Sequence, residues 1–251
     1  MNNYEVTQIE KGVYLIFEPA EDVGSSMYLV VGEKKAALID SGMGTGNLPG
    51  LVDELTYLPV LPLLSHGHSD HYLGMLSYSW IYMDEADVPL IRKDYEMNKE
   101  EAEAQCEKLP PLPGLLPLSK LMDEDGRIDL GGRHLSVVPL PGHTPGSVGF
   151  LLEEDRILFS GDGLTYNVWM QLPESSSLED YLETLHSLRP LKDRFDRIYN
   201  GHSIDPFPAD FLEKVIWLIE KVIEEPFGTP VGEPFPGIEA SGDGCMVTYR
   251  P

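Results

Sequence analysis

The sequence predicts an α/β protein in which two mixed β-sheets pack face to face and carry helices on their outer sides. Three observations support this fold class. The 251 residues are 42% hydrophobic and 24% charged, which are globular values. Short segments rich in β-branched residues alternate with amphipathic helical segments. This strand-then-helix arrangement occurs twice, so each half of the chain predicts one sheet with its own helical layer.

The first half predicts an antiparallel meander, then a helix and a buried strand. Strands are expected over 13–17, 27–31, 36–39 and 61–64, where β-branched or apolar residues cluster. Leucines recur at helical spacing over 48–58, after a glycine-rich turn at 42–46. The acidic stretch 84–106 is also helical in pattern. The proline-rich segment 109–117 is expected to be a surface loop.

The second half repeats this order. Strands are expected over 135–140, 148–152, 156–159 and 197–199. A helix over 178–188 is predicted to begin after Ser177, a favoured N-cap residue, and a last helix is predicted over 211–223. The Pro- and Gly-rich segment 226–237 is expected to be a loop. The length suits one domain, and we expect residues 1–251 to form it.

The charge of the chain excludes some partners. Lys and Arg number 18 and Asp and Glu number 42, which gives a net charge of −24. Such a surface repels phosphate backbones and anionic lipid headgroups, so neither nucleic acid nor a membrane is an expected partner. The N-terminus shows no secretory signal and the two cysteines form no C-x-x-C pair, so a cytoplasmic location is predicted.

Seven polar residues at strand ends form the chemical signature of the sequence. Three histidines and an aspartate follow the strand at 61–64 in the pattern H-x-H-x-D-H. In an extended turn alternate residues point the same way, so His66 and His68 could hold one ion while Asp70 and His71 address another. The other three lie in turns further along the chain, and they are His143, Asp162 and His202. By contrast, His134 and His186 lie outside this pattern and are expected to be structural.

This ordered set resembles the metal-binding set of the metallo-β-lactamase superfamily, and the resemblance covers nearly the whole chain. It implies an αβ/βα four-layer sandwich with two metal ions at one edge. The implied first ligand set is His66, His68 and His143. The implied second set is Asp70, His71 and His202, with Asp162 bridging the two ions. Asp40, in the strand end that precedes the motif, either caps a turn or orients a ligand histidine.

The resemblance implies a metal-dependent hydrolase. Two divalent ions would lower the pKa of a bridging water from about 15.7 towards 7 and so supply hydroxide for attack on a carbonyl. Zinc is the favoured ion, and iron and manganese suit the same ligands. Asp70 could pass a proton to the leaving group. Tyr166 either donates a hydrogen bond to the carbonyl or packs in a loop. We expect one of two roles for the apolar residues after Asp162: they line a pocket for an acyl chain, or they pack in the core. These residues are Tyr166, Trp169, Met170 and Leu172.

The predicted substrate is a carbonyl ester, thioester or lactone of a small metabolite. The ligand set is similar to that of glyoxalase II-like thioesterases, and that resemblance implies a basic C-terminal patch that binds the glutathione carboxylates. Residues 205–251 contain only Lys214, Lys221 and Arg250 as basic residues, so glutathione itself is disfavoured. The alternatives are a mononuclear iron persulfide dioxygenase of the same fold, a phosphodiesterase of the superfamily, and a non-catalytic metal-binding protein. The apolar segments 112–118 and 226–236 could pack against a second subunit, so a homodimer is a further expectation.

Overall fold

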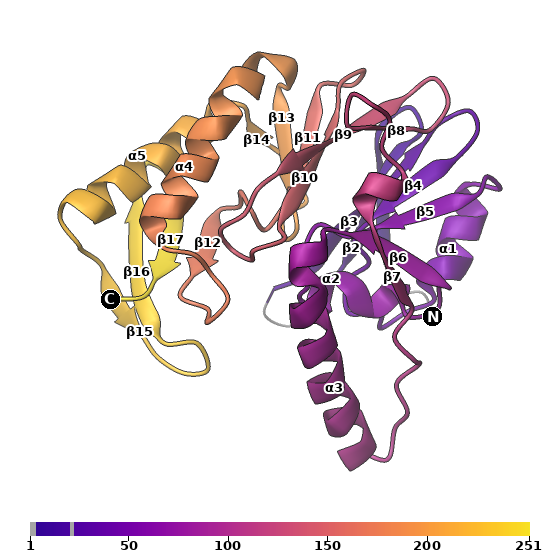
Figure 1. Cartoon of the computed structure of the whole chain (residues 1–251), viewed down its shortest axis with the longest axis horizontal. Coiled ribbons are helices and arrows are strands. Elements are labelled where there is room, and N and C mark those ends of the chain that lie inside the picture. Colours follow the sequence, from indigo (N-terminus) through magenta and orange to yellow (C-terminus); the bar gives the residue numbers. More distant parts are fainter. Residues whose placement is uncertain (1–3, 21–22) are drawn as a thin grey trace.

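Three β-sheets and their covering helices make up the computed structural model, which describes residues 4–20 and 23–251 (Figure 1). The α-helices are α1 (Leu48–Leu55), α2 (Ser69–Tyr72), α3 (Val88–Ala104), α4 (Leu178–Leu188) and α5 (Phe211–Glu224). Short 3₁₀ helices are η1 (Leu73–Met75), η2 (Glu85–Asp87), η3 (Leu118–Lys120) and η4 (Arg189–Arg194). No helix of these described residues is long and apolar enough to cross a bilayer.

The first sheet contains the predicted meander. Its strands, in spatial order, are β1 (Glu5–Glu10), β2 (Val13–Glu18), β3 (Ser25–Val31), β4 (Ala36–Ile39), β5 (Val60–Leu63), β6 (Trp80–Met83) and β7 (Gly114–Pro117). Strands β1 to β4 pair antiparallel, and β4 to β7 pair parallel through crossovers that contain α1 and α3. The carboxyl ends of β4 and β5 therefore meet at one edge, which is where the H-x-H-x-D-H motif begins.

The second sheet is also mixed. Its spatial order is β14 (Phe207–Pro208), β13 (Arg197–Asn200), β11 (Ile157–Gly161), β10 (Val148–Leu152), β9 (His134–Pro139) and β8 (Arg127–Asp129). Strands β11 and β13 run parallel, joined by a crossover that contains α4. This pairing brings the turns that contain Asp162 and His202 to the same edge of the sheet.

Three apolar clusters define the layers. The cluster between the two sheets joins Tyr28 of β3 to Phe159 of β11, whose ring centroids are 4.7 Å apart. A second cluster packs α1 and α3 onto the outer face of the first sheet, and a third packs α4 and α5 onto the second half. The amphipathic faces of these helices thus bury apolar surface against sheets that are themselves buried on both sides. The predicted αβ/βα sandwich is confirmed.

A third sheet was not predicted. It is made of β12 (Asn167–Met170), β17 (Cys245–Tyr249), β16 (Gly237–Gly242) and β15 (Thr229–Val231), in that order, and it packs against α5. The expectation of a loop over 226–237 was therefore wrong at 229–231 and at Gly237, where β16 begins. The strands are short, β15 contains Pro230, and β16 begins and ends with Gly, which weakens the strand signal. The sheet is completed by pairing of β17 with β12, about 80 residues earlier.

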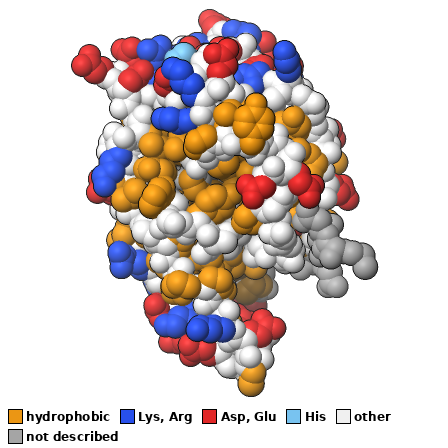
Figure 2. All heavy atoms as spheres, turned by 90° about the vertical axis from the view of Figure 1, so that its right-hand side faces the viewer, with side chains coloured by type: hydrophobic (Ala, Val, Ile, Leu, Met, Phe, Trp, Pro, Cys, Tyr) orange, Lys and Arg blue, Asp and Glu red, His pale blue; other side chains and the backbone are white. Residues whose placement is uncertain are grey.

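The expected surface loop over 109–117 was also partly wrong, because residues 114–117 form β7 at the edge of the first sheet. Figure 2 shows hydrophobic side chains gathered on the side of the molecule that carries α1 and the β5–β7 part of this sheet. Trp80, the first residue of β6, is 50% exposed. An edge strand beside apolar surface is compatible with association between copies, so the homodimer stays a prediction.

Candidate metal centre

The seven predicted ligands lie in four loops that converge at one edge of the sandwich. Each loop follows the carboxyl end of a strand: β5, β9, β11 or β13. The motif was expected to be an extended turn, but only its first part is extended. His68 has extended backbone angles, with φ −84° and ψ 150°, and α2 begins at the next residue. His71 lies in this turn of helix, and its ring centroid is 4.1 Å from that of His66.

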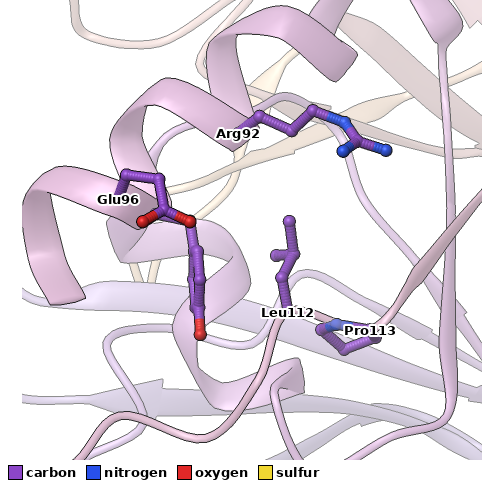
Figure 3. Close-up of a pocket in the computed structure, with 5 residues that line it drawn as sticks. Arg92, Glu96, Leu112 and Pro113 are labelled. Carbon is purple, nitrogen blue, oxygen red and sulfur yellow. The ribbon is translucent and has the colours of Figure 1, made fainter.

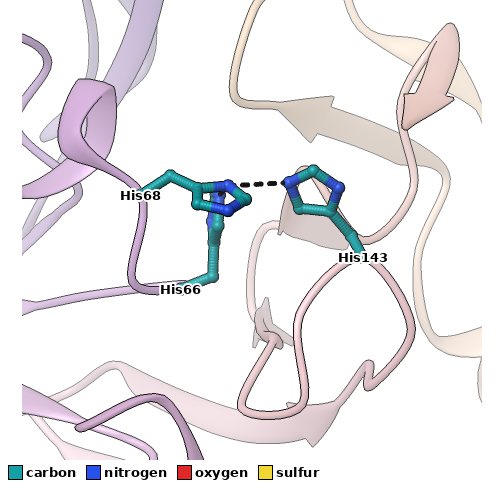
Figure 4. A group of neighbouring side chains, drawn as sticks. All are labelled: His66, His68 and His143. Carbon is teal, nitrogen blue, oxygen red and sulfur yellow. Dashed lines mark hydrogen bonds between the residues drawn. The ribbon is translucent and has the colours of Figure 1, made fainter. Parts of the chain in front are cut away.

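The first cluster consists of His66, His68 and His143 (Figure 4). The Nδ1 atom of His68 lies 3.1 Å from Nε2 of His66 and 3.0 Å from Nε2 of His143. Three ring nitrogens therefore converge on one point, as the ligand atoms of a tetrahedral site with one open position would.

The second cluster consists of Asp70, His71 and His202. Oδ2 of Asp70 lies 3.5 Å from Nε2 of His71 and 3.6 Å from Nε2 of His202. Asp162 lies between the clusters. Its Oδ2 is 2.9 Å from Nε2 of His202 and 3.9 Å from Nε2 of His143, and its Oδ1 is 3.6 Å from Nε2 of His71.

Two buried atoms of this group lack a hydrogen-bond partner among the described residues. They are Nε2 of His71 and Oδ1 of Asp162, and both point into the space that the clusters enclose. Leaving such atoms unpaired costs about 1–3 kcal/mol each. A divalent cation would satisfy both, since imidazole and carboxylate are the ligands that it takes in mixed sites. The residues present therefore fit a bound metal.

The electrostatics differ between the two clusters. Burial, reinforced by neighbouring imidazoles, holds the pKa of His66 well below its usual range and lowers the pKa of His143 to about 4. Both rings are neutral at pH 7, as ligands must be. In the second cluster burial also lowers the pKa of His202, but the nearby Asp162 carboxylate has the larger effect and raises this pKa to about 9. A cation binding there would have to displace a proton.

Every predicted ligand histidine also has a partner on its outer nitrogen. The pairs are His66 Nδ1 with Ser65 Oγ at 3.0 Å, His68 Nε2 with Glu174 Oε1 at 2.7 Å, His71 Nδ1 with Asp40 Oδ2 at 3.0 Å, His143 Nδ1 with the Trp169 carbonyl at 2.8 Å, and His202 Nδ1 with the Gly24 carbonyl at 3.0 Å. Such contacts fix the ring orientation and the tautomer, and they leave the inner nitrogen free to bind metal.

Asp40 lies at the centre of this outer layer. Besides His71, its carboxylate accepts hydrogen bonds from the Ser65 amide and the Ser65 hydroxyl, both at 2.7 Å. Ser65 in turn contacts His66, so one carboxylate links the two clusters. Asp40 has a φ of +58°, an uncommon conformation that Asp tolerates better than most residues.

Two carboxylates of the site were missed from the sequence. Asp87 is fully buried and accepts hydrogen bonds from the amides of Gly67 and Gly146 and from the Thr144 hydroxyl, at 2.9, 2.7 and 2.6 Å. It thereby connects the motif loop with the loop of His143. The only sequence signal is that Asp87 lies near the start of the predicted helical stretch 84–106. Glu174, which contacts His68, lies in a turn and has no sequence signal.

The predicted apolar wall is only partly exposed. Met170 and Leu172 are buried in the core of the second half, so the core interpretation holds for them. Trp169 is 39% exposed and packs against Phe235 of the β15–β16 loop, with ring centroids 5.6 Å apart. Tyr166 is 45% exposed, and among the described residues its hydroxyl makes no hydrogen bond with a predicted ligand.

His134 and His186 lie outside the clusters, paired with Glu154 and Glu220 respectively. A pocket of about 390 Å³ is also separate from the clusters. It lies between α3 and residues 112–113, with Arg92 and Glu96 on one side and Leu112 and Pro113 on the other (Figure 3). None of the predicted ligands lines it.

Comparisons with known proteins agree with this geometry. A family model described as "Metallo-beta-lactamase superfamily" matches residues 20–202. "Acyl-coenzyme A thioesterase MBLAC2" of Gallus gallus is 29% identical over 215 residues, which are 76% of this chain and 77% of that protein. "Hydroxyacylglutathione hydrolase GloC" of Haemophilus influenzae is 32% identical over 133 residues, which are 53% of this chain and 62% of that protein.

Solved structures resemble the chain at lower identity. "Metallo-beta-lactamase from Pontibacter korlensis" superposes with a TM-score of 0.64 at 20% identity, covering 86% of this chain and 99% of that one. At this identity the likeness supports the fold alone. The family model covers about three quarters of the sequence. The His and Asp residues that the sequence predicts as ligands all lie in one of the two clusters or between them. The chain therefore belongs to the metallo-β-lactamase superfamily.

Proposed function

We propose that this chain, a metal-dependent hydrolase, holds two divalent ions, zinc above all, and hydrolyses thioesters of small acyl metabolites. The observation that supports the dinuclear site is the position of Asp162, whose carboxylate lies within reach of both clusters. Oδ2 lies against His202 and near His143, whereas the unpaired Oδ1 faces His71. A carboxylate in this position is suited to bridge two cations.

When bound, such a metal pair supplies hydroxide at neutral pH and polarises the carbonyl oxygen under attack. Proton transfer is carried out by side chains of the protein. Asp70 is more exposed to solvent than Asp162, since 34% of its side chain is exposed against 12% for Asp162. It can therefore accept a proton at the carboxylate oxygen that does not bind metal and release it to a departing thiolate. Replacing Asp70 by Asn should lower both the rate and the metal occupancy.

The thioester assignment is supported by relatives that carry thioesterase or hydroxyacylglutathione hydrolase names. We propose that the acyl group lies along Trp169, because the carbonyl of this residue already accepts a hydrogen bond from His143. Its indole and the ring of Phe235 form an exposed aromatic pair beside the first cluster. Trp169→Ala should raise KM for a long acyl chain about 5–10-fold more than for an acetyl thioester, which corresponds to about 1–1.4 kcal/mol.

The matched control for the acyl site is Trp217→Ala. Trp217 has a similar exposed fraction, 45%, but it lies on α5. If both variants change the chain-length preference equally, or if neither does, the acyl site is not at Trp169.

The test of the function as a whole combines elemental analysis with turnover. Protein purified without added metal should contain close to two zinc ions per chain and hydrolyse thioesters, and a chelator should abolish this turnover until zinc is restored. A panel containing acyl-coenzyme A, acylglutathione, a lactone and a phosphodiester identifies the bond that is cleaved. One iron ion per chain, with oxygen consumption on a persulfide and no hydrolysis, would overturn the proposal in favour of a dioxygenase.

A further inference from the structure

His68 faces the first cluster differently from its neighbours. It presents Nδ1 to the cluster, whereas His66 and His143 present Nε2. Its outer nitrogen is therefore Nε2, and this atom lies 2.7 Å from Oε1 of Glu174. We infer that Glu174 is a positioning residue that holds the His68 ring with Nδ1 aimed at the first metal. This inference rests on the metal centre proposed above.

The backbone of Glu174 is held in a turn. The Ser175 amide donates to the Leu172 carbonyl at 3.1 Å, and Pro173 precedes Glu174 within this turn. Proline fixes φ near the value that the second residue of a type I or II turn requires. The carboxylate of Glu174 therefore projects from a stiff support although 22% of its side chain is exposed.

The same turn is tied to the loop of another ligand. The Ser175 hydroxyl donates to the His143 carbonyl at 2.9 Å, and the Ser176 amide donates to the Gly142 carbonyl at 2.9 Å. Since His143 also donates to the Trp169 carbonyl, residues 169–176 contact two of the three ligands of the first cluster. This segment, which we call the bracing turn, sets His68 and His143 relative to each other.

The bracing turn depends on the end of the chain. Arg250 donates from Nη2 to the Ser175 carbonyl at 2.7 Å, and β17 pairs with β12 so that Thr248 lies opposite Trp169. Residues 245–250 lie outside the stretch that the family model matches, 20–202. The third sheet thus supports the first cluster through Glu174, although it contributes no ligand.

Glu174 acts by favouring one tautomer of His68. A lone pair is available at Nδ1 only when the proton resides on Nε2, and a carboxylate that accepts this proton's hydrogen bond favours that tautomer. It also makes the ring a stronger donor to a cation. Removing such a partner typically weakens metal affinity 10–100-fold.

The experiment is a cobalt(II) titration of chelator-stripped protein, followed by visible absorption and by metal stoichiometry. Glu174→Ala should weaken binding at the three-imidazole site about 10–100-fold and leave the other equivalent unchanged. Glu174→Gln should lose less, because its amide oxygen can still accept from Nε2. The spectra separate the sites, since one offers three nitrogens and the other two nitrogens and a carboxylate.

The matched control is Glu154→Gln, which alters a second His–carboxylate pair, with His134 at 2.9 Å, away from the clusters. This variant should titrate as wild type. If Glu174→Ala also titrates as wild type, or loses both ions together with a lower melting temperature of the metal-free protein, the positioning role is refuted and the metal centre stands. A wild-type chain that binds no cobalt would instead overturn the metal centre and this inference with it.

Discussion

Replacing Asp87 by Ala should destabilise the metal-free protein substantially. Asp87 is fully buried and connects the motif loop to the His143 loop through three hydrogen bonds. After truncation, Thr144 can still pair with the Ser147 hydroxyl at 2.8 Å, but the amides of Gly67 and Gly146 lose their acceptor. At about 1–3 kcal/mol for each buried unpaired group, the loss is about 2–6 kcal/mol. For a chain of this size that lowers the melting temperature by about 5–20 °C.

The assay is thermal unfolding in the presence of a chelator, so that lost metal binding does not contribute to the difference. Asp84→Asn is the control, because Asp84 lies three residues earlier, caps η2 by accepting from the Ala86 amide, and is not buried. It should melt within about 1 °C of wild type, since Asn caps as well as Asp. A melting temperature of Asp87→Ala within 2 °C of wild type would show that the connection between the loops is not stabilising.

The stability of the wild-type protein should also depend on Asp87 through pH. Burial raises the pKa of Asp87, although its three donors oppose this change. The folded state therefore holds this proton more tightly than the unfolded state. Between the ordinary pKa of an aspartate and the raised value, this group should make stability fall as pH rises. Asp87→Asn should remove that component, which chemical denaturation at several pH values measures; an unchanged pH dependence would contradict the assignment.

Three further predictions concern the glycine at the second cluster, the cysteines and the metal. Gly201→Ala should reduce metal content from two ions towards one, because the added Cβ would collide with Asp162 and His71, whereas Gly232→Ala, with open space around it, should keep both ions by elemental analysis. Burial raises the pKa of Cys245 to about 11, so at pH 8 only roughly one thiol in a thousand is ionised. A thiol reagent should therefore modify only the exposed Cys106 in the native chain and both cysteines after denaturation. Modification of both cysteines in the native chain would contradict the burial of Cys245. Chelation should lower the melting temperature, because a cation that binds only the folded state stabilises that state. An unchanged value would argue against metal bound there.

Much of the fold could be predicted from local sequence patterns. The helix over 178–188 and the strand over 36–39 match the structure at both ends, because a capping serine and a run of apolar residues are local signals. The helix expected over 48–58 ends at Leu55, since Pro59 begins the approach to β5 and residues before proline disfavour helical angles. The third sheet gave no comparable signal, because its strands are stabilised by partners distant in sequence.

The seven candidate ligands were determined by the sequence itself. Each is a His or Asp in a segment that follows a strand, and parallel strands bring their carboxyl ends to one edge, so the order of residues along the chain was enough to group them. Only the tertiary structure decided what surrounds them. Glu174 contacts His68, 106 residues earlier, and Asp87 contacts Thr144 and Gly146, 57 and 59 residues later. No local pattern distinguishes such carboxylates from the many others in a chain with 42 acidic residues. A ligand is recognised by its residue type, which the sequence gives directly. The residue that orients a ligand is recognised only by its position in the folded chain.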